Sequence, residues 1–174
     1  WGGRPKIDRL VYKPILEAAT RLAALKTGAV DLIANVEPEQ VHDIQSDPNL
    51  RIARARSARI MFVGLNSFRK PFDDVRVRQA MNYAVDVDAI IKELMSGFAH
   101  RLPTIVGPAY FGYDPAQKPY PYDPAKAKAL LAQAGYPNGF EVPFHTPKGR
   151  YLMDAEIAQA VSGYLAKVGV RAKV

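Results

Sequence analysis

The segment from Arg59 to Ala80 limits the possible folds of this chain more than any other. Its residues 60–65 form an apolar run, Ile-Met-Phe-Val-Gly-Leu, so we expect a strand that is covered on both faces or lines a cleft. Pro71 then marks a turn, and Asp73 or Asp74 can cap the helix that follows. The core-facing side of this helix is expected to hold Val77, Ala80, Met81 and Ala84.

Upstream of this segment, strand-like and helix-like stretches alternate. β-Branched and aromatic residues predict strands at 7–12, 29–34 and 50–56. A helix is expected to begin at Pro14 and to end at Gly28, and a shorter helix to span 38–45. The order of strand, crossover helix and strand predicts an α/β fold.

Downstream, the chain continues with capped helices, short strands and one long loop. We expect a helix between its cap Asp86 and Gly97, helices at 123–134 and 151–168, and strands at 140–144 and 170–174. Residues 99–122 are rich in Pro, Gly and Tyr and have no periodicity, which predicts a long ordered loop. The side chains expected to anchor it are Tyr110, Phe111, Tyr113, Tyr120 and Tyr122.

The composition excludes several classes of protein. Of the 174 residues, 48% are hydrophobic and 24% are charged, which is typical of a soluble globular chain rather than a disordered one. No stretch approaches the roughly 20 uninterrupted apolar residues of a membrane span. Because the chain has no cysteine, disulfides and thiolate metal sites are ruled out.

The net charge of +7 raises the alternative of a basic nucleic-acid-binding domain. The densest basic cluster comprises Arg51, Arg54, Arg56 and Arg59. Neither a groove-entering helix nor an alternation of aromatic and basic residues accompanies this cluster, so we interpret it as solvated or paired side chains.

The sequence contains no motif for catalysis or metal binding. His42, His100 and His145 lie far apart and do not share the spacing of metal ligands. Nucleophile elbow, P-loop and dinucleotide fingerprint are all missing, and the paired acids Asp73 and Asp74 stand at a helix start, where capping explains them. We therefore predict that the protein is not an enzyme and that it uses no cofactor and no metal.

The residues themselves indicate three places where a ligand can bind. Asn35 follows the expected strand 29–34, and in open α/β sheets ligands bind beyond the carboxyl ends of the strands. Gly64 stands inside an apolar strand, where a glycine marks either a bulge or the close approach of a ligand or another backbone. The segment from His145 to Arg150 lies between a strand end and a helix start, where backbone N–H groups and Arg150 can hold an anionic or carbonyl group. The alternative for this segment is a solvated loop without a ligand.

Seven segments of the chain carry a family resemblance that covers essentially its whole length. They are 1–8 (WGGRPKID), 24–31 (ALKTGAVD), 65–66 with 71–80 (LN and PFDDVRVRQA), 82–86 (NYAVD), 122–127 (YDPAKA), 130–136 (LLAQAGY) and 168–170 (VGV). In this order they resemble the bacterial extracellular solute-binding proteins of the peptide and nickel transport class, which deliver ligands to ABC importers.

The resemblance implies an α/β fold like that of the type II periplasmic binding proteins, in the peptide-binder class, with two lobes that close on a solute. It assigns residues 1–57 to the end of lobe I, residues 58–66 to a hinge crossover strand and residues 67–174 to most of lobe II. The chain is then an internal fragment of a longer protein. The ligand-facing positions that the resemblance implies are Ala34, Asn35, Val36, Arg59, Phe62, Gly64, His145 and Arg150.

The implied function is to capture a peptide or peptide-like solute and deliver it to a membrane permease, in the periplasm or another extracytoplasmic location. Peptide binders of the class often carry tyrosine or an acidic residue where this hinge strand has Phe62 and Gly64, so a sugar or a nickel chelate stays an alternative ligand. Nucleic acid is not an implied partner. We further expect little affinity from residues 1–174 alone, and homodimers through exposed strand edges at 7–12 and 32–34.

Overall fold

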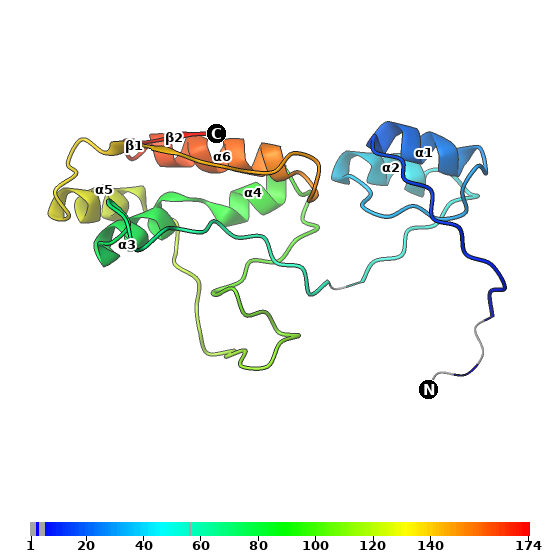
Figure 1. The fold of residues 1–174 in the computed structure, drawn as a ribbon, viewed down its shortest axis with the longest axis horizontal. Helices are drawn as coiled ribbons and strands as arrows, with labels where there is room; N and C mark the ends of the chain where they lie inside the picture. Colours follow the sequence, from blue (N-terminus) through cyan, green and yellow to red (C-terminus); the bar gives the residue numbers. More distant parts are fainter. Residues whose placement is uncertain (1–2, 4–5, 56) are drawn as a thin grey trace. The chain divides into compact units, whose positions relative to one another are not determined.

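The computed structural model describes residues 3, 6–55 and 57–174, and its elements fall into two compact units, residues 1–51 and 52–174. The first unit holds helix α1 (Ala18–Lys26), the 3-10 helix η1 (Pro38–Gln40) and helix α2 (Val41–Gln45) (Figure 1). The second holds helices α3 (Val75–Ala84), α4 (Val87–Glu93), α5 (Pro124–Gln133) and α6 (Asp154–Ala166), and strands β1 (Phe140–Pro143) and β2 (Val170–Lys173).

Aspartate caps begin α3, α4 and α5, as the sequence predicts. Asp74, rather than Asp73, caps α3 and accepts a hydrogen bond from the Arg76 N–H at 2.8 Å. Asp86 caps α4 and Asp123 caps α5, at donor distances of 3.0 Å and 2.8 Å. Each carboxylate satisfies a backbone donor that the helix end leaves unpaired, so the three helices start where the local sequence places them.

The core of the second unit lies where α3 packs against α5 and where α6 covers the two strands. The predicted inner face of α3 is confirmed, because its four expected residues are all buried. Leu131 of α5 and Val170 of β2 are among the largest fully buried side chains. The other buried members of this core are Val85, Ile90, Ala127, Val161, Leu165, Val168 and Ala172.

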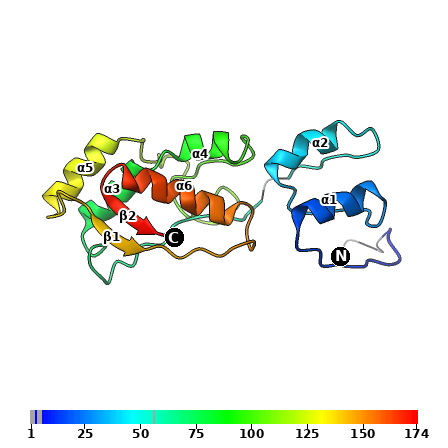
Figure 2. The same cartoon turned by 90° about the horizontal axis from the view of Figure 1, so that it is seen from above.

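Strands β1 and β2 form a parallel pair, with α6 as the crossover between them. The register begins with Phe140 opposite Val170. The Ser162 hydroxyl donates to the Ala172 carbonyl at 2.6 Å and so ties α6 to β2. Figure 2 shows the two strands side by side next to α6. Both strands predicted for this region are confirmed.

Two glycines meet where these strands begin. Gly139 has a φ of +74°, and Gly169 has a φ of +90°. A Cβ added at Gly139 would lie 1.9 Å from the Gly169 carbonyl oxygen, so only glycine fits this position. The close backbone approach allows β1 to start directly beside the start of β2.

Two helices begin later than the sequence predicts. Helix α1 starts at Ala18 instead of Pro14 because the backbone of Glu17 is still extended. The Arg21 guanidinium, rather than helical N–H groups, binds the carbonyls of Ile15 and Leu16, at 3.2 Å and 2.7 Å. Helix α6 starts at Asp154 instead of residue 151, because the left-handed φ of 56° at Met153 interrupts the helix.

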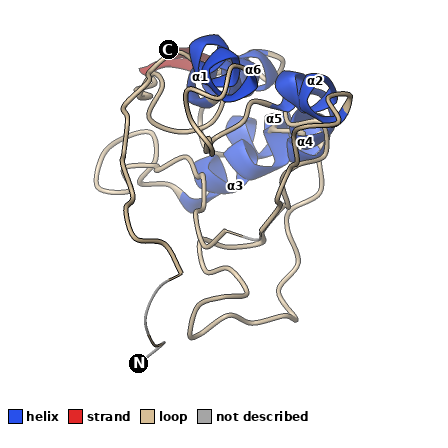
Figure 3. Cartoon of the chain, turned by 90° about the vertical axis from the view of Figure 1, so that its right-hand side faces the viewer, coloured by secondary structure: helices blue, strands red, loops and turns tan. Residues whose placement is uncertain are grey.

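The strands expected at 7–12, 29–34, 50–56 and 60–65 are wrong for the described residues. A strand requires a neighbour that completes its hydrogen-bond ladder, and within the described part of the chain these segments have none. Figure 3 accordingly shows the strand colour only at β1 and β2. Apolar side chains in these segments are exposed as a result, such as Leu10 at 65% and Phe62 at 69%.

A few sequence predictions concern residues outside the described ranges. These are Trp1, Gly2, Arg4 and Pro5 of the first matching segment, and Arg56 of the basic cluster.

Candidate functional site

Residues 58–62 and the tip of the loop 99–122 form a pocket of about 440 Å³. Its lining comprises Ala58, Arg59, Ile60, Phe62, Ile105, Val106, Tyr110 and Phe111. The Tyr110 hydroxyl donates to the Ala58 carbonyl at 2.7 Å and joins the loop to this segment. Arg59 is the charged side chain in a lining that is otherwise apolar and aromatic. The pocket therefore suits a ligand that has an apolar portion next to a negative group.

Aromatic rings hold the C-terminal end of the loop, as expected from the sequence. Tyr120 packs edge-on against Tyr83 with 5.0 Å between the ring centroids, and Tyr122 packs against Tyr164 at 5.6 Å. The expectation is wrong for Phe111, which is fully exposed because no described residue covers it. The loop is thus fixed at its base, while an aromatic ring stands free at its tip.

Arg101 closes the base of the same loop. Its guanidinium donates to the Asp88 carboxylate at 2.6 Å and also to the Tyr120 carbonyl. One side chain therefore bridges α4, the start of the loop and its end. The Arg101 side chain is only 16% exposed, whereas its partner Asp88 is 69% exposed.

Replacing Arg101 by alanine is expected to loosen the loop. The change leaves the Tyr120 carbonyl without this donor, and we expect it to cost about 1–2 kcal/mol and to speed proteinase K cleavage within 99–122 roughly tenfold. Mass spectrometry of the cleavage products measures this. Lys118→Ala, which removes an exposed positive charge from the same loop, is the matched control. Equal cleavage rates for the two variants would show that Arg101 does not hold the loop.

Two of the predicted site residues approach the ring of Tyr151. The Arg59 guanidinium carbon is 5.9 Å from the centre of the Tyr151 ring, and that of Arg150 is 5.4 Å away. Among the residues that the structure describes, neither guanidinium forms an ion pair with a carboxylate. Two uncompensated guanidiniums at one aromatic ring can bind an anionic group, since arginine pairs well with carboxylates.

The Asp154 carboxylate determines the conformation of the loop before α6. It is buried and accepts hydrogen bonds from the backbone N–H groups of Gly149, Arg150, Tyr151 and Ala155, at 2.9 Å to 3.0 Å. The sequence interpretation that backbone N–H groups of this loop bind a ligand is therefore wrong for residues 149 and 150. A carboxylate of the protein itself already occupies those donors, and the Arg150 side chain remains for a ligand.

The same contacts make the free energy of unfolding depend on pH. Burial acts to raise the pKa of Asp154, but the four backbone hydrogen bonds outweigh it, so the pKa lies below its ordinary value of 3.8. The stability that this carboxylate contributes is complete above pH 3.8 and is lost as the pH falls through the depressed pKa of the folded state. We expect Asp154→Asn to reduce the loss of stability between pH 5 and pH 2, measured by urea unfolding at each pH. An unchanged acid slope would contradict this.

The other predicted site residues lie outside these contacts. Ala34, Asn35 and Val36 belong to the first unit, where Asn35 is exposed and has a left-handed φ of 56°. His145 is exposed in the segment after β1. A Cβ at Gly64 would have the Phe62 ring as its nearest neighbour, at 4.0 Å, so its own surroundings give no structural reason for glycine. Their roles toward a ligand stay predictions.

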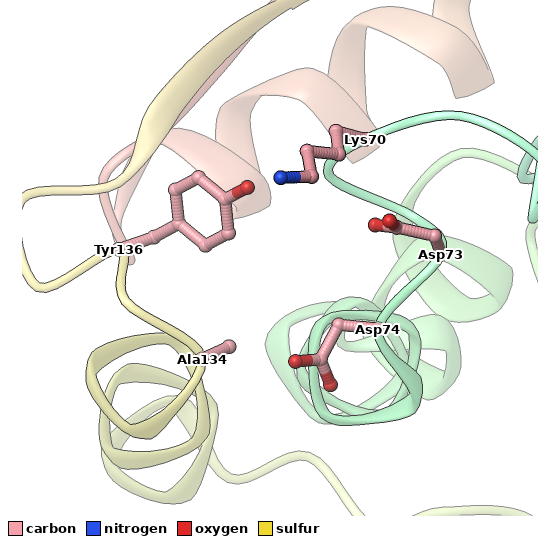
Figure 4. A pocket seen from close by; sticks show the side chains of 5 residues that line it. All are labelled: Lys70, Asp73, Asp74, Ala134 and Tyr136. Atoms are coloured by element: carbon pink, nitrogen blue, oxygen red, sulfur yellow. The ribbon is translucent and has the colours of Figure 1, made fainter.

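A second pocket of about 320 Å³ lies between the turn before α3 and the end of α5. Figure 4 shows its lining residues, which are Lys70, Asp73, Asp74, Ala134 and Tyr136. Asp74 is already engaged as the cap of α3 and pairs with Arg76 at 2.5 Å. Arg76 also donates to the Gln133 carbonyl at 2.8 Å, which ties α3 to α5. Asp74 thus serves helix capping, and no predicted ligand residue lines this pocket.

Sequence reasoning missed Tyr151, Asp154 and the apolar residues at the tip of the loop. Tyr151 and Asp154 were hidden inside a helix that was expected to start at residue 151. Two residue types in the sequence could have indicated that α6 starts later. They are Gly149, which has a left-handed φ of +76°, and Asp154 in the first turn of α6. Ile105 and Val106 have no periodic context, so a sequence pattern does not assign them to a pocket wall.

Known proteins place this fold among the solute-binding proteins. Its structural neighbours are periplasmic binding proteins, so the predicted α/β class of type II periplasmic-binding-protein-like folds is confirmed. The family model described as bacterial extracellular solute-binding proteins, family 5 Middle, matches residues 1–174. The chain belongs to this family.

Three relatives illustrate the match. Heme-binding protein A of Haemophilus influenzae is 36% identical in an alignment 174 positions long, which covers 98% of this chain and 32% of that protein. The glutathione-binding protein GsiB of Escherichia coli is 33% identical over 172 residues, or 99% of this chain and 33% of GsiB. The ABC transporter-associated periplasmic binding protein DppA of Helicobacter pylori, solved with the peptide STSA, aligns with a TM-score of 0.85 and 36% identity over 99% of this chain and 33% of DppA. The chain thus spans about a third of the length of these relatives.

Proposed function

We propose that the protein is the substrate-binding component of an ABC importer. It captures a peptide or peptide-like solute between two lobes and passes it to a membrane permease, in the periplasm or another extracytoplasmic location. Membership of the solute-binding family supports this, as do relatives named for binding a peptide, glutathione or heme. Within the described residues, no helix is both long and apolar enough to cross a membrane.

The observation that carries the proposal is a pair of arginines beside an apolar pocket, neither of which forms an ion pair within the described part of the chain. Arg59 lines the pocket and also faces Tyr151, which Arg150 approaches from the loop before α6. A solute that has both a carboxylate and an apolar side chain can bind the arginines with the first and the apolar pocket wall with the second. A hydrogen bond to a charged group contributes about 1.5–3 kcal/mol, so one carboxylate between two arginines accounts for a large part of the affinity.

The two-lobe organisation remains part of the proposal. Residues 1–57 are the end of lobe I, residues 58–66 are one hinge crossing and residues 67–174 are part of lobe II. The division into compact units at residues 51 and 52 supports a boundary near this place. In the longer protein, further residues pair with segments such as 60–65, whose apolar side chains are exposed in the described chain. Closure of the lobes then buries the solute.

The second part of the proposal is that the protein binds its solute without catalysis. We also propose that it does not bind nucleic acid. The family is a solute-binding one. Within the basic cluster, the Arg54 guanidinium stacks 4.2 Å from the centre of the Phe98 ring, and Arg59 faces Tyr151. The sequence interpretation was solvated or paired side chains, and these two arginines contact aromatic rings instead. Binding to DNA or RNA that falls steeply with salt would instead favour the nucleic-acid alternative.

A ligand screen on the full-length protein tests the proposal. The panel contains the peptide STSA, glutathione, heme, a neutral sugar and a nickel–histidine chelate. A ligand at 100 times its Kd is expected to stabilise the protein by about 2.7 kcal/mol, which thermal shift detects. Stabilisation by the peptide or glutathione supports the proposal, and residues 1–174 alone should show little. If only the sugar or the chelate raises the melting temperature, the proposed ligand changes from a peptide-like solute to that ligand. If no ligand of the panel raises it, the result counts against solute binding.

Self-association through the segments 7–12 and 32–34 also stays a proposal. Tyr12 and Leu32 are 86% and 79% exposed, which suits pairing with a second chain. Sedimentation velocity of residues 1–174 at rising concentration checks it, and a monomer at every concentration would reject it.

A further inference from the structure

Asp154 uses its carboxylate in an unusual way for a residue at the start of a helix. An N-terminal capping side chain normally binds N–H groups in the first turn of its own helix. Asp154 makes one such bond, to Ala155, and directs its other bonds to the three consecutive residues 149–151 that precede the helix. Most of its hydrogen-bonding capacity therefore shapes the loop rather than the helix.

The geometry of these bonds fixes the positions of the loop residues relative to one another. Oδ2 accepts from both Arg150 and Tyr151, each at 3.0 Å, and Oδ1 accepts from Gly149 at 3.0 Å. Three successive N–H groups that converge on one carboxylate require a tight curve in the backbone. Asp154 is 5% exposed and, among the described residues, its carboxylate forms no ion pair, so these backbone groups are its partners.

The backbone next to Asp154 is strained in a way that needs such support. Met153 has a φ of 56° and a ψ of 30°, the left-handed region that a bulky side chain rarely adopts. A residue in this region costs of order 1–3 kcal/mol and persists only where its surroundings determine it. The bonds from Asp154 lie directly around it, and they hold the turn that sends the chain from the loop into α6.

We propose that Asp154 is a positioning residue for solute binding, which holds Arg150 and Tyr151 where they meet Arg59 and the anionic group of the solute. This inference rests on the proposed function. Asp154 itself does not touch the solute, because its carboxylate is buried and occupied. Asp154 acts through the backbone of Arg150 and Tyr151, the two residues proposed to contact the solute.

A purely structural role makes a different prediction. If Asp154 only stabilised α6, its replacement would lower the melting temperature and leave the Kd of the folded protein unchanged. Glu156→Gln is the matched control for this role. Glu156 is the other acidic residue in the first turn of α6, and it is exposed, so the change removes the same charge from the helix start without touching the loop.

The first test needs no ligand. Amide hydrogen exchange of the full-length protein, wild type and Asp154→Asn, is followed at residues 149–151 and in the buried part of α6. We expect exchange at 149–151 to rise by roughly tenfold or more while the α6 amides keep their protection. Unchanged exchange at 149–151, or an equal rise throughout α6, would overturn the positioning role.

The second test is a double-mutant cycle on affinity. Titration calorimetry measures the Kd of glutathione or the peptide STSA, whichever saturates the wild type, for Asp154→Asn, Arg150→Ala and the double variant. We expect Asp154→Asn to weaken binding roughly tenfold in the wild type and less than about twofold when Arg150 is already alanine, because coupled residues are not additive. Equal losses in both backgrounds would overturn the inference. If neither probe binds the wild type, the peptide-like solute of the proposed function fails, while the exchange experiment still decides whether Asp154 holds the loop.

Discussion

Replacing Gly139 by alanine is expected to lower the free energy of unfolding by about 2–5 kcal/mol, the sum of a left-handed backbone penalty and an overpacking cost. The alanine Cβ would lie 1.9 Å from the carbonyl oxygen and 2.3 Å from the carbonyl carbon of Gly169. Both are backbone atoms, so relief requires β1 and β2 to separate at their first residue pair. Urea unfolding followed by circular dichroism measures the effect.

Alanine substitutions at two other glycines distinguish the backbone penalty from the overpacking cost. Gly135 has a φ of +91° but open space around a Cβ, so Gly135→Ala is expected to show the backbone penalty alone, about 1–2 kcal/mol. Gly163 lies inside α6 with open space and no positive φ, so Gly163→Ala is expected to stabilise by about 0.5–1 kcal/mol. If Gly139→Ala cost no more than Gly135→Ala, the close approach of the two strands would not constrain the fold.

Replacing Arg59 or Arg150 by alanine in the full-length protein is expected to weaken binding of a carboxylate-bearing solute by roughly 10- to 100-fold. Each change removes one charged hydrogen-bond donor, worth about 1.5–3 kcal/mol, from the group that both arginines face. Calorimetry with the best ligand of the screen measures the loss. Because both guanidiniums approach Tyr151, we also expect the double variant to lose less than the product of the single losses.

Arg69→Ala is the control for net charge. Arg69 is an exposed residue of the turn before α3 and does not line the pocket. We expect it to change the Kd by less than about twofold, since exposed charges distant from a ligand are largely screened by salt. A loss equal to that of Arg150→Ala would mean that the overall positive charge, rather than a defined site, attracts the solute.

The parts of the fold that were predictable from sequence are those that local chemistry determines. Asp86 and Asp123 begin helices because a side chain and a backbone donor three residues later suffice for a cap. The buried face of α3 follows from helical spacing alone. By contrast, an apolar run such as residues 60–65 becomes a strand only when another segment pairs with it, and that partner is not encoded in the run itself.

In the candidate site, too, the two arginines were predictable from sequence, but their spatial arrangement was not. Arg59 and Arg150 were predicted separately, one from the hinge strand of the family and one from its place before a helix. Their meeting at Tyr151 depends on the course of the loop, which the buried Asp154 carboxylate sets through four backbone hydrogen bonds. A side chain that binds backbone groups leaves no pattern of residue types, so sequence periodicity does not reveal it.

The tip of the loop 99–122 bears on how this kind of protein acquires new ligands. Its ends are anchored by Arg101, Tyr120 and Tyr122, whereas Ile105 and Phe111 at the pocket wall are exposed and contribute nothing to the buried core. Substitutions at the tip therefore alter the lining of the pocket at little cost in folding stability. Under the proposed function, mutation and selection can change what the pocket accepts by altering a few exposed residues, while the helices that carry the fold stay the same.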